Sequence, residues 1–166
     1  MIQMKKRILL VLLLLGTVSC FAAQVSFQVV QHNNSVDSVT EEARVVEDAL
    51  IDSFFDAGYI VTNSEASLAR TITDDTKLWS IGMQEAVSGF SDYFVQVILE
   101  FTEMYDETIN RNVLILNKAK YNISDTAYLE KLSEEELLCN LKINNPSDLA
   151  IISESLIYEI YKVLNA

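Results

Sequence analysis

Alternating hydrophobic and polar residues predict strands along much of the chain. Residues 24–30 alternate with a period of two, and residues 59–62 form a short, continuously apolar run. A longer alternation covers residues 92–105, and a second run at 111–123 returns after the polar turn at 106–110. Two such runs joined by a short polar turn are typical of an antiparallel hairpin.

The two faces of the first hairpin strand differ in polarity. One face carries only apolar residues, namely Tyr93, Val95, Val97, Leu99 and Phe101. The other face mixes apolar and polar residues, namely Phe94, Gln96, Ile98 and Glu100. An antiparallel sheet of this kind commonly packs its apolar face on the core and leaves the other face to solvent. We therefore expect the helices to pack on one face of the sheet.

Apolar residues three or four positions apart predict two clear helices. The first is expected over about residues 39–57, with Ser38 and Glu41 as a capping box and Gly58 just after its end. Its apolar stripe comprises Ala43, Val46, Leu50, Phe54 and Ala57. The last helix is expected to follow a cap at Asn145. Its stripe comprises Leu149, Ile152, Leu156, Ile160 and Val163.

Other segments have weaker helical patterns. Residues 77–90 predict a helix, although Gly82 in its middle costs about 1 kcal/mol relative to alanine. Residues 70–76 read as a loop before it, and residues 63–69 as a brief helical turn. Residues 133–140 begin with a possible capping box and predict another short helix.

Together these elements predict an α+β fold. The order is strand-helix-strand, then short helices, an antiparallel hairpin and a carboxy-terminal helix. We expect a mixed sheet of about four strands with the helices packed on one face.

The amino-terminal 23 residues predict a secretory signal peptide, followed by a single domain at residues 24–166. Three basic residues, Lys5, Lys6 and Arg7, precede the apolar run at residues 8–15, and small residues fill much of the exit at 16–23. This order of basic, apolar and small residues is that of a signal peptide, and the apolar run is too short for a membrane span. We expect an exported protein that is periplasmic or associated with the envelope.

Cys20 leaves open how the exported protein is held. The sequence TVSC resembles a bacterial lipoprotein box, in which Cys20 would be lipidated, although Thr17 stands where that motif usually has leucine. The alternative is plain secretion after cleavage at Ala22 or Ala23. We expect contact with a membrane only if Cys20 is lipidated.

The charge of the mature chain limits its partners. The signal contains three of the 12 basic residues and none of the 24 acidic ones, so the mature chain has a formal charge of −15. Such a surface repels nucleic acid and anionic lipid. We expect no nucleic-acid partner, and another envelope protein is the expected partner.

A resemblance to a known group of proteins arises from the segment VVEDALIDSFFDAGYIVTNSEA after the first strand. It resembles envelope proteins related to the curli-secretion lipoprotein and the amino-terminal domain of the Tol-system propeller protein. The matching positions are Leu50, Phe54, Gly58, Tyr59 and Val61, followed by Ala86, Asp92, Tyr93 and Val95. The resemblance covers about residues 24–101 and implies a fold and an envelope location. The chain lacks both the propeller and a pore-hairpin pattern, so neither translocation nor pore formation is implied.

Few residues suggest catalysis. The single histidine, His32, is interpreted as a surface loop residue, and a triad of His32 with Ser91 and Asp92 is disfavoured. The sequence has no phosphate-binding or dinucleotide-binding motif, so we expect no cofactor. The acidic segments 73–75 and 103–107 lack the spacing of a calcium loop, and we expect no metal site. Cys139 lies between leucines and is interpreted as a buried thiol.

Two candidate sites remain. Trp79, Met83 and Phe90 could line a ligand groove beside residues 71–76, although aromatic residues at helical spacing more often belong to a core. A candidate partner surface lies on the first helix, where Phe55 projects beside the solvent-facing acids Asp48, Asp52 and Asp56.

Three functions are consistent with these observations. A non-catalytic binding or assembly module of the bacterial envelope is the favoured hypothesis, because no catalytic grouping is evident. The first alternative is a carboxylate-dependent hydrolase with a pair such as Asp74 and Glu85. The second is a carrier of a small ligand in the periplasm.

Overall fold

The computed structural model describes residues 22–166. The predicted signal lies outside the described residues apart from its last two positions, and Cys20 lies outside them as well. The elements, in chain order, are β1 (Gln24–His32), α2 (Glu41–Asp56), β2 (Ile60–Ala69), α3 (Ile72–Ser88), β3 (Tyr93–Asp106), β4 (Arg111–Asp125), β5 (Glu130–Ile143), the 3-10 turn η1 (Pro146–Leu149) and α4 (Ala150–Leu164).

The five strands form one mixed sheet in the order β2-β1-β3-β4-β5, one strand more than expected. β1 lies between β2 and β3 and is parallel to both, because each connection among these strands contains a helix. β3, β4 and β5 are antiparallel neighbours joined by short turns. The α+β class and the β3–β4 hairpin are as the sequence predicts.

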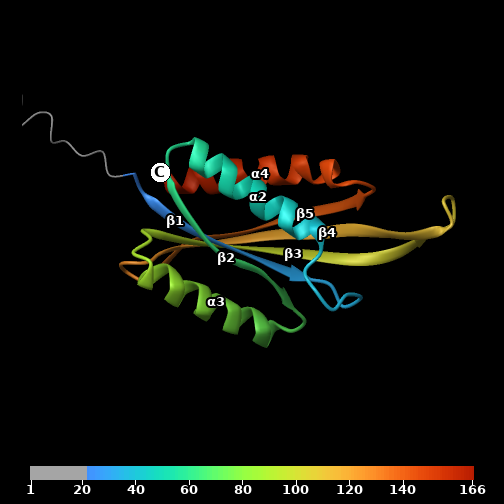
Figure 1. The fold of residues 1–166 in the computed structure, drawn as a ribbon, viewed down its shortest axis with the longest axis horizontal. Coiled ribbons are helices and arrows are strands. Elements are labelled where there is room, and N and C mark those ends of the chain that lie inside the picture. The colour runs from blue at the N-terminus through green and yellow to red at the C-terminus, as the bar shows by residue number, and fades with distance from the viewer. Residues whose placement is uncertain (1–21) are drawn as a thin grey trace, which may run out of the picture.

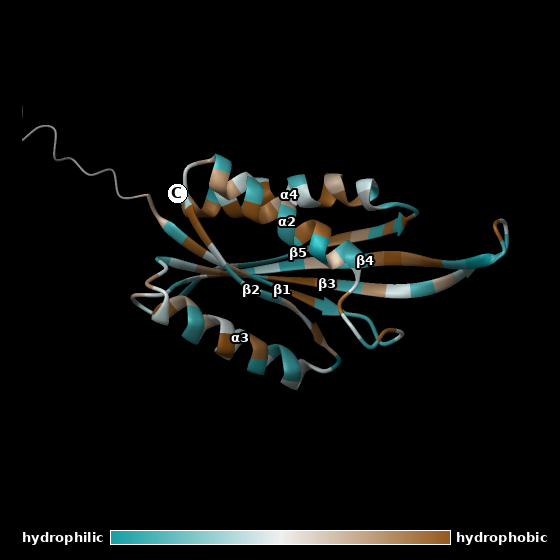
Figure 2. Ribbon diagram, viewed as in Figure 1, coloured by the Kyte–Doolittle hydropathy of each residue, from teal (hydrophilic) through white to brown (hydrophobic). Residues whose placement is uncertain are grey.

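The main core lies between the sheet and the helices α2 and α4, which share one face (Figure 1). The alternating apolar residues of β1 and β3 point into it, as does the predicted stripe of α2 with the exception of Ala57, which is exposed. Figure 2 shows hydrophobic segments of the strands running beneath the helices. The three acids Asp48, Asp52 and Asp56 are exposed on the outer side of α2.

The expectation that all helices pack on one face is wrong, because α3 covers the opposite face (Figure 1). The mixed face of the sheet contains enough apolar surface for this, since Val30, Phe94 and Ile98 are buried there. Two of its buried polar residues are paired, since Gln96 Nε2 donates to Gln28 Oε1 at 2.9 Å. A buried polar pair that is hydrogen-bonded costs little, so a helix can cover it.

The predicted short helix at residues 133–140 is also wrong, because this segment lies within the edge strand β5. The pairing of β4 with β5 shifts register between Leu116 and Lys118 and again between Ile123 and Ser124. Each irregularity interrupts the alternation of faces along β5, so the segment lacks the period of two that identifies a strand.

Two boundaries near α3 differ from the sequence prediction. Residues 63–69 continue β2 instead of forming a helical turn, because they pair with β1 up to Ala69 and His32. The expected loop at 70–76 is largely the first turn of α3. Thr71 caps this helix in a capping box with Asp74, and the two side chains bond each other's backbone N–H groups.

The sheet has two different ends. At one end the β3–β4 hairpin extends past the helices as a two-stranded projection (Figure 1). At the other end lie the start of β1, the end of α3 and the turn between β4 and β5. Across residues 22–166, no helix is both long and apolar enough to cross a bilayer.

Candidate functional site

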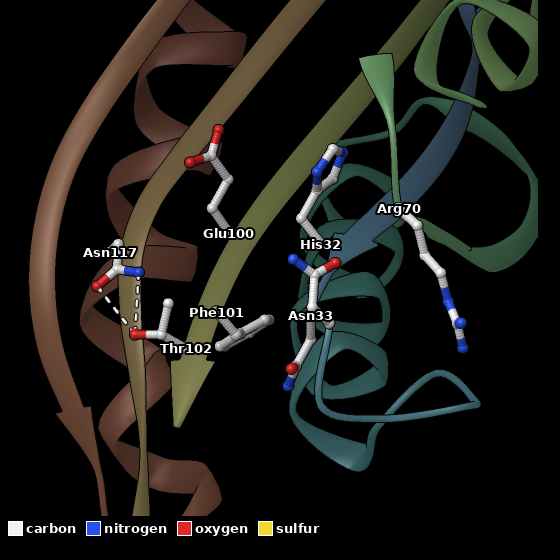
Figure 3. Close-up of a pocket in the computed structure, with 8 residues that line it drawn as sticks. His32, Asn33, Arg70, Glu100, Phe101, Thr102 and Asn117 are labelled. Atoms are coloured by element: carbon white, nitrogen blue, oxygen red, sulfur yellow. Dashed lines mark hydrogen bonds between the residues drawn. The ribbon is translucent and has the colours of Figure 1, made fainter. Parts of the chain in front are cut away.

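A cleft lies at the carboxyl end of β1, where the chain connections change sides. The crossover from β1 to β2 passes through α2 on one face, and the crossover from β2 to β3 passes through α3 on the other. In open sheets with parallel strands, a crevice forms where the connections diverge in this way, and such crevices are usual ligand sites. The cleft has a volume of about 220 Å³. Its lining residues are His32, Asn33, Asn34, Arg70, Glu100, Phe101, Thr102 and Asn117 (Figure 3).

His32 is the last residue of β1, so its interpretation as a loop residue is wrong. Its Nε2 lies 2.6 Å from Oδ1 of Asp75 in the first turn of α3, and both side chains are about one quarter exposed. The sequence does not reveal this pair, because Asp75 is 43 residues away in a segment that reads as a loop.

Asn33 has an unusual hydrogen-bonding state. It follows β1 and lies between His32 and Phe101 in the cleft wall (Figure 3). Its side chain is buried, and Oδ1 accepts from the Ser35 N–H at 2.9 Å. Its Nδ2 has no hydrogen-bond partner among the described residues. A buried donor without a partner costs about 1–3 kcal/mol, so an acceptor supplied from outside would be favoured here.

An ion-pair network leads away from the cleft over β3, β4 and β5. Lys120 Nζ lies 3.3 Å from carboxylate oxygens of both Glu100 and Glu136, and Lys118 Nζ lies 3.2 Å from Glu136. Partial burial alone would lower the pKa of Lys120, but hydrogen bonds to Glu136 and Glu100 raise it overall. The Lys118 and Lys120 ammonium groups lower the pKa of Glu136. Lys120 and Glu136 therefore stay charged near neutral pH.

The predicted ligand groove is only partly present. A groove of about 480 Å³ runs between α3 and the sheet, where Trp79, Gln96, Ile98 and Lys120 line it. Of the three residues proposed from the sequence, only Trp79 contributes to it. Met83 is buried with Ala86 and Phe94, and Phe90 is exposed in the turn after α3.

The candidate partner surface on α2 is apart from the cleft. Phe55 is 68% exposed in the last turn of α2, whereas the cleft includes Asn33 and Asn34 of the segment that precedes this helix. Phe55 is thus not covered by any neighbouring element within residues 22–166. The sequence leaves open whether Phe55 is covered or part of a partner surface. The structure shows that Phe55 is exposed, and its role in binding stays a prediction.

The two catalytic groupings considered from the sequence are not assembled. Asp74 and Glu85 lie eleven residues apart on α3, which places them about 16 Å apart along the helix axis. Glycosidase carboxylates lie about 5–10 Å apart. Asp92 accepts from the backbone N–H of Gln24 at the start of β1, whereas His32 ends that strand about 26 Å away.

The β3–β4 arm, defined as residues 102–115, adjoins the cleft. Thr102 and Asn117 are hydrogen-bonded to each other at its base, and Asp106 forms an ion pair with Lys142 of β5. Its outer part exposes the large apolar side chains of Met104, Tyr105 and Ile109. Figure 2 shows that hydrophobic residues of β4 continue past the first turn of α2, toward the hairpin turn.

Two further kinds of site are considered within residues 22–166, a metal site and a reactive cysteine. No group of three or more histidine, cysteine or acidic side chains in this part of the chain is placed to hold a metal ion. Cys139 is half-buried beside the core, its Sγ is near the Leu137 carbonyl oxygen at 3.3 Å, and burial raises its pKa. A raised pKa disfavours the reactive thiolate.

A protein-family model described as "Uncharacterised protein" matches residues 24–132. A search of curated protein sequences gives no match.

Several solved structures resemble the fold. Lipoprotein GNA1162 from Neisseria meningitidis is 10% identical, with 84% of this chain and 99% of that chain covered and a TM-score of 0.47. The PelC dodecamer from Paraburkholderia phytofirmans is 13% identical, with 87% and 89% covered and a TM-score of 0.48. TolB from Acinetobacter baumannii is 15% identical, with 86% of this chain but 28% of that chain covered and a TM-score of 0.40. These structures include a lipoprotein and TolB, the kinds of envelope protein that the sequence resembles, and the likeness concerns the fold alone.

Proposed function

The chain belongs to this family of uncharacterised proteins, and we propose that it is a non-catalytic binding or assembly module of the bacterial cell envelope. In this proposal the protein is exported and binds another envelope protein through the β3–β4 arm and the adjoining cleft.

The observation that carries the proposal is the exposed apolar surface at the end of the arm. Met104, Tyr105 and Ile109 are large apolar residues, and each is more than 40% exposed on a hairpin that extends past the helical layers. Because these side chains are largely exposed, they add little to folding. Aromatic residues and methionine are enriched at protein interfaces, which favours a partner surface here.

The cleft supports binding more than catalysis. Its histidine is paired with Asp75, and the hydroxyl of Thr102 is engaged with the Asn117 amide. The unpaired Nδ2 of the buried Asn33 is a donor that a partner's carbonyl or carboxylate oxygen would satisfy. We infer that the arm provides the apolar contact and the cleft a polar contact with the same partner.

The test compares the arm with another exposed apolar surface. The variant Met104→Ser/Tyr105→Ser/Ile109→Ser is expressed in the native host beside a control, Ile151→Ser/Tyr158→Ser, which changes two exposed residues of α4. After mild crosslinking and purification, we expect one envelope protein to copurify with the wild type and with the control. The amount that copurifies with the arm variant should be at least tenfold lower. Retention of the same protein by the arm variant would overturn the proposal, as would recovery of no partner by the wild type.

A small-ligand carrier is the second candidate, favoured by the groove beside Trp79. Its volume of about 480 Å³ lies within the range of small-molecule sites. Native mass spectrometry of the protein purified from its host would show a discrete added mass if it carries a ligand. A bare protein mass in every preparation would count against this function.

A further inference from the structure

The end of the molecule opposite the cleft is formed by two loops that are tied together. The loop at residues 89–92 joins α3 to β3, and the turn at 126–129 joins β4 to β5. The backbone N–H of Thr126 donates to the carbonyl oxygen of Asp92 at 3.0 Å, and its hydroxyl donates to the carbonyl oxygen of Ser91. Figure 1 shows both turns side by side at the end where β1 begins.

These loops expose three large apolar or aromatic side chains, Phe90, Tyr128 and Leu129, which we call the apolar tip. Their exposed fractions are 88%, 81% and 66%. Residues 89–91 and 126–129 contain no charged side chain. In a chain with a net charge of −12, these seven uncharged residues form an apolar patch, although Asp92, Asp125 and Glu130 border it.

Two residues of the apolar tip adopt a backbone conformation that bulky residues rarely adopt. The φ angles of Phe90 and Leu129 are 60° and 55°. This left-handed region suits glycine and asparagine, whereas other L-residues are strained there by roughly 1–2 kcal/mol. The chain therefore has phenylalanine and leucine at two exposed positions where glycine would favour folding. Strain of this kind often accompanies a functional surface.

The apolar tip also lies where the amino-terminal segment joins the domain. The backbone N–H of Gln24 donates to Asp92 Oδ2 at 2.8 Å, and its side-chain Nε2 donates to the Gly89 carbonyl oxygen at 2.9 Å. Cys20 precedes Gln24 by four residues, a span of about 14 Å at full extension. The lipoprotein-like cysteine and the apolar run at 8–15 are thus connected to the same end of the fold as the apolar tip.

We propose that the apolar tip inserts into the interface of a lipid bilayer and orients the domain with its β3–β4 arm directed away from the membrane. Aromatic side chains favour the interface between lipid and water, and apolar residues beside them add buried area. The surrounding acids Asp92, Asp125 and Glu130 disfavour anionic headgroups, so the surface fits zwitterionic lipid. The binding role of the arm is independent of this contact.

The test measures the depth of two labelled positions in the membrane. In the full chain, processed and purified from cells with Cys139→Ser, an environment-sensitive fluorophore is attached at Ala127→Cys in the apolar tip or at Thr108→Cys in the arm turn. Vesicles of phosphatidylcholine with brominated acyl chains are then added. We expect quenching of the label at 127 and little quenching at 108. Equal quenching at both positions, or none at 127, would overturn the proposal even if a lipid anchor holds the protein on the vesicle.

Substitutions at the two strained positions separate a membrane role from a structural one. We expect Phe90→Gly and Leu129→Gly to raise the melting temperature, because they relieve backbone strain, while together they lower quenching at 127 at least threefold. The control Ile151→Ser/Tyr158→Ser should leave quenching unchanged. If the glycine variants melt at a lower temperature and the label at 127 is quenched as strongly as in the wild type, the two residues serve the fold and the proposal fails.

Discussion

His32 Nε2 lies 2.6 Å from Asp75 Oδ1, and this contact joins the last residue of β1 to the first turn of α3. This side-chain contact connects β1 to α3 at the edge of the cleft. Because both side chains are only about one quarter exposed, solvent screens the interaction less than it screens a surface ion pair.

Loss of this contact should loosen the amino end of α3. We expect Asp75→Ala to lower the free energy of unfolding by about 1–2 kcal/mol, as measured by urea denaturation. Asp37→Ala is the matched control, because the Asp37 carboxylate pairs with Arg70 but is fully exposed. That control should change stability by less than about 0.5 kcal/mol. Equal effects of the two changes would contradict a special role for the pair.

Gly82 is required by the close approach of α3 to the sheet. A Cβ atom at this position would lie 2.5 Å from Cζ and 2.8 Å from Cε2 of the buried Phe94 ring. We expect Gly82→Ala to destabilise the domain by about 1–2 kcal/mol, since the overlap outweighs the higher helix propensity of alanine. Ser80→Ala, an exposed change on the same helix, should be neutral or slightly stabilising. A thermal melt in which Gly82→Ala is the more stable protein would refute this packing.

Phe54 and Phe55 are adjacent but should respond very differently to truncation. Phe54 is fully buried, and its ring lies 5.1 Å from Phe27 and 5.4 Å from Tyr59 between centroids. Phe54→Ala should cost about 3–5 kcal/mol. Phe55→Ala should cost less than about 0.5 kcal/mol, because its side chain is exposed. A loss of several kcal/mol for Phe55→Ala would exclude Phe55 as an open partner surface.

The ion pair between Asp106 and Lys142 should make the stability of the arm sensitive to acid. The hydrogen bond from Lys142 holds the pKa of Asp106 at about 2, below its ordinary value of 3.8. A carboxylate with a lowered pKa in the folded state contributes stability that is complete above 3.8 and is lost as the pH falls toward 2. Asp106→Asn should therefore differ most from the wild type near neutral pH, and the two melting curves should converge in acid.

Thermal melts between about pH 7 and pH 2 test this pH dependence. Glu107→Gln provides the control, because it removes a neighbouring carboxylate that is exposed in the turn. A constant difference between wild type and Asp106→Asn across this range would show that the pair contributes no pH dependence.

The sequence predicts the elements whose periodicity is regular. The α2 stripe ends at the buried Phe54, Gly58 follows the helix with a φ of 91°, and β3 and β4 pair as expected. It fails at β5, where two register shifts remove the alternation. It also predicts a helix within α3 but places it on the wrong face of the sheet, because coverage of the mixed face depends on the pairing of Gln28 with Gln96, which are 68 residues apart.

The sites are less predictable than the fold because they depend on residues distant in sequence. The cleft brings together the end of β1, the base of the arm and a residue after β2. Nothing local marks His32 as the partner of Asp75. Phe90 and Leu129 are ordinary apolar residues in the sequence, and only their exposure and positive φ angles distinguish them.

The proposal that the arm binds another envelope protein is tested most directly by crosslinking in living cells. A photoreactive amino acid replaces Tyr105 in the arm or Tyr158 on α4, two exposed tyrosines in different parts of the fold. We expect a discrete adduct at position 105 that mass spectrometry identifies as one envelope protein, and no such adduct at position 158. The absence of an adduct at 105, or the same adducts at both positions, would contradict the proposal.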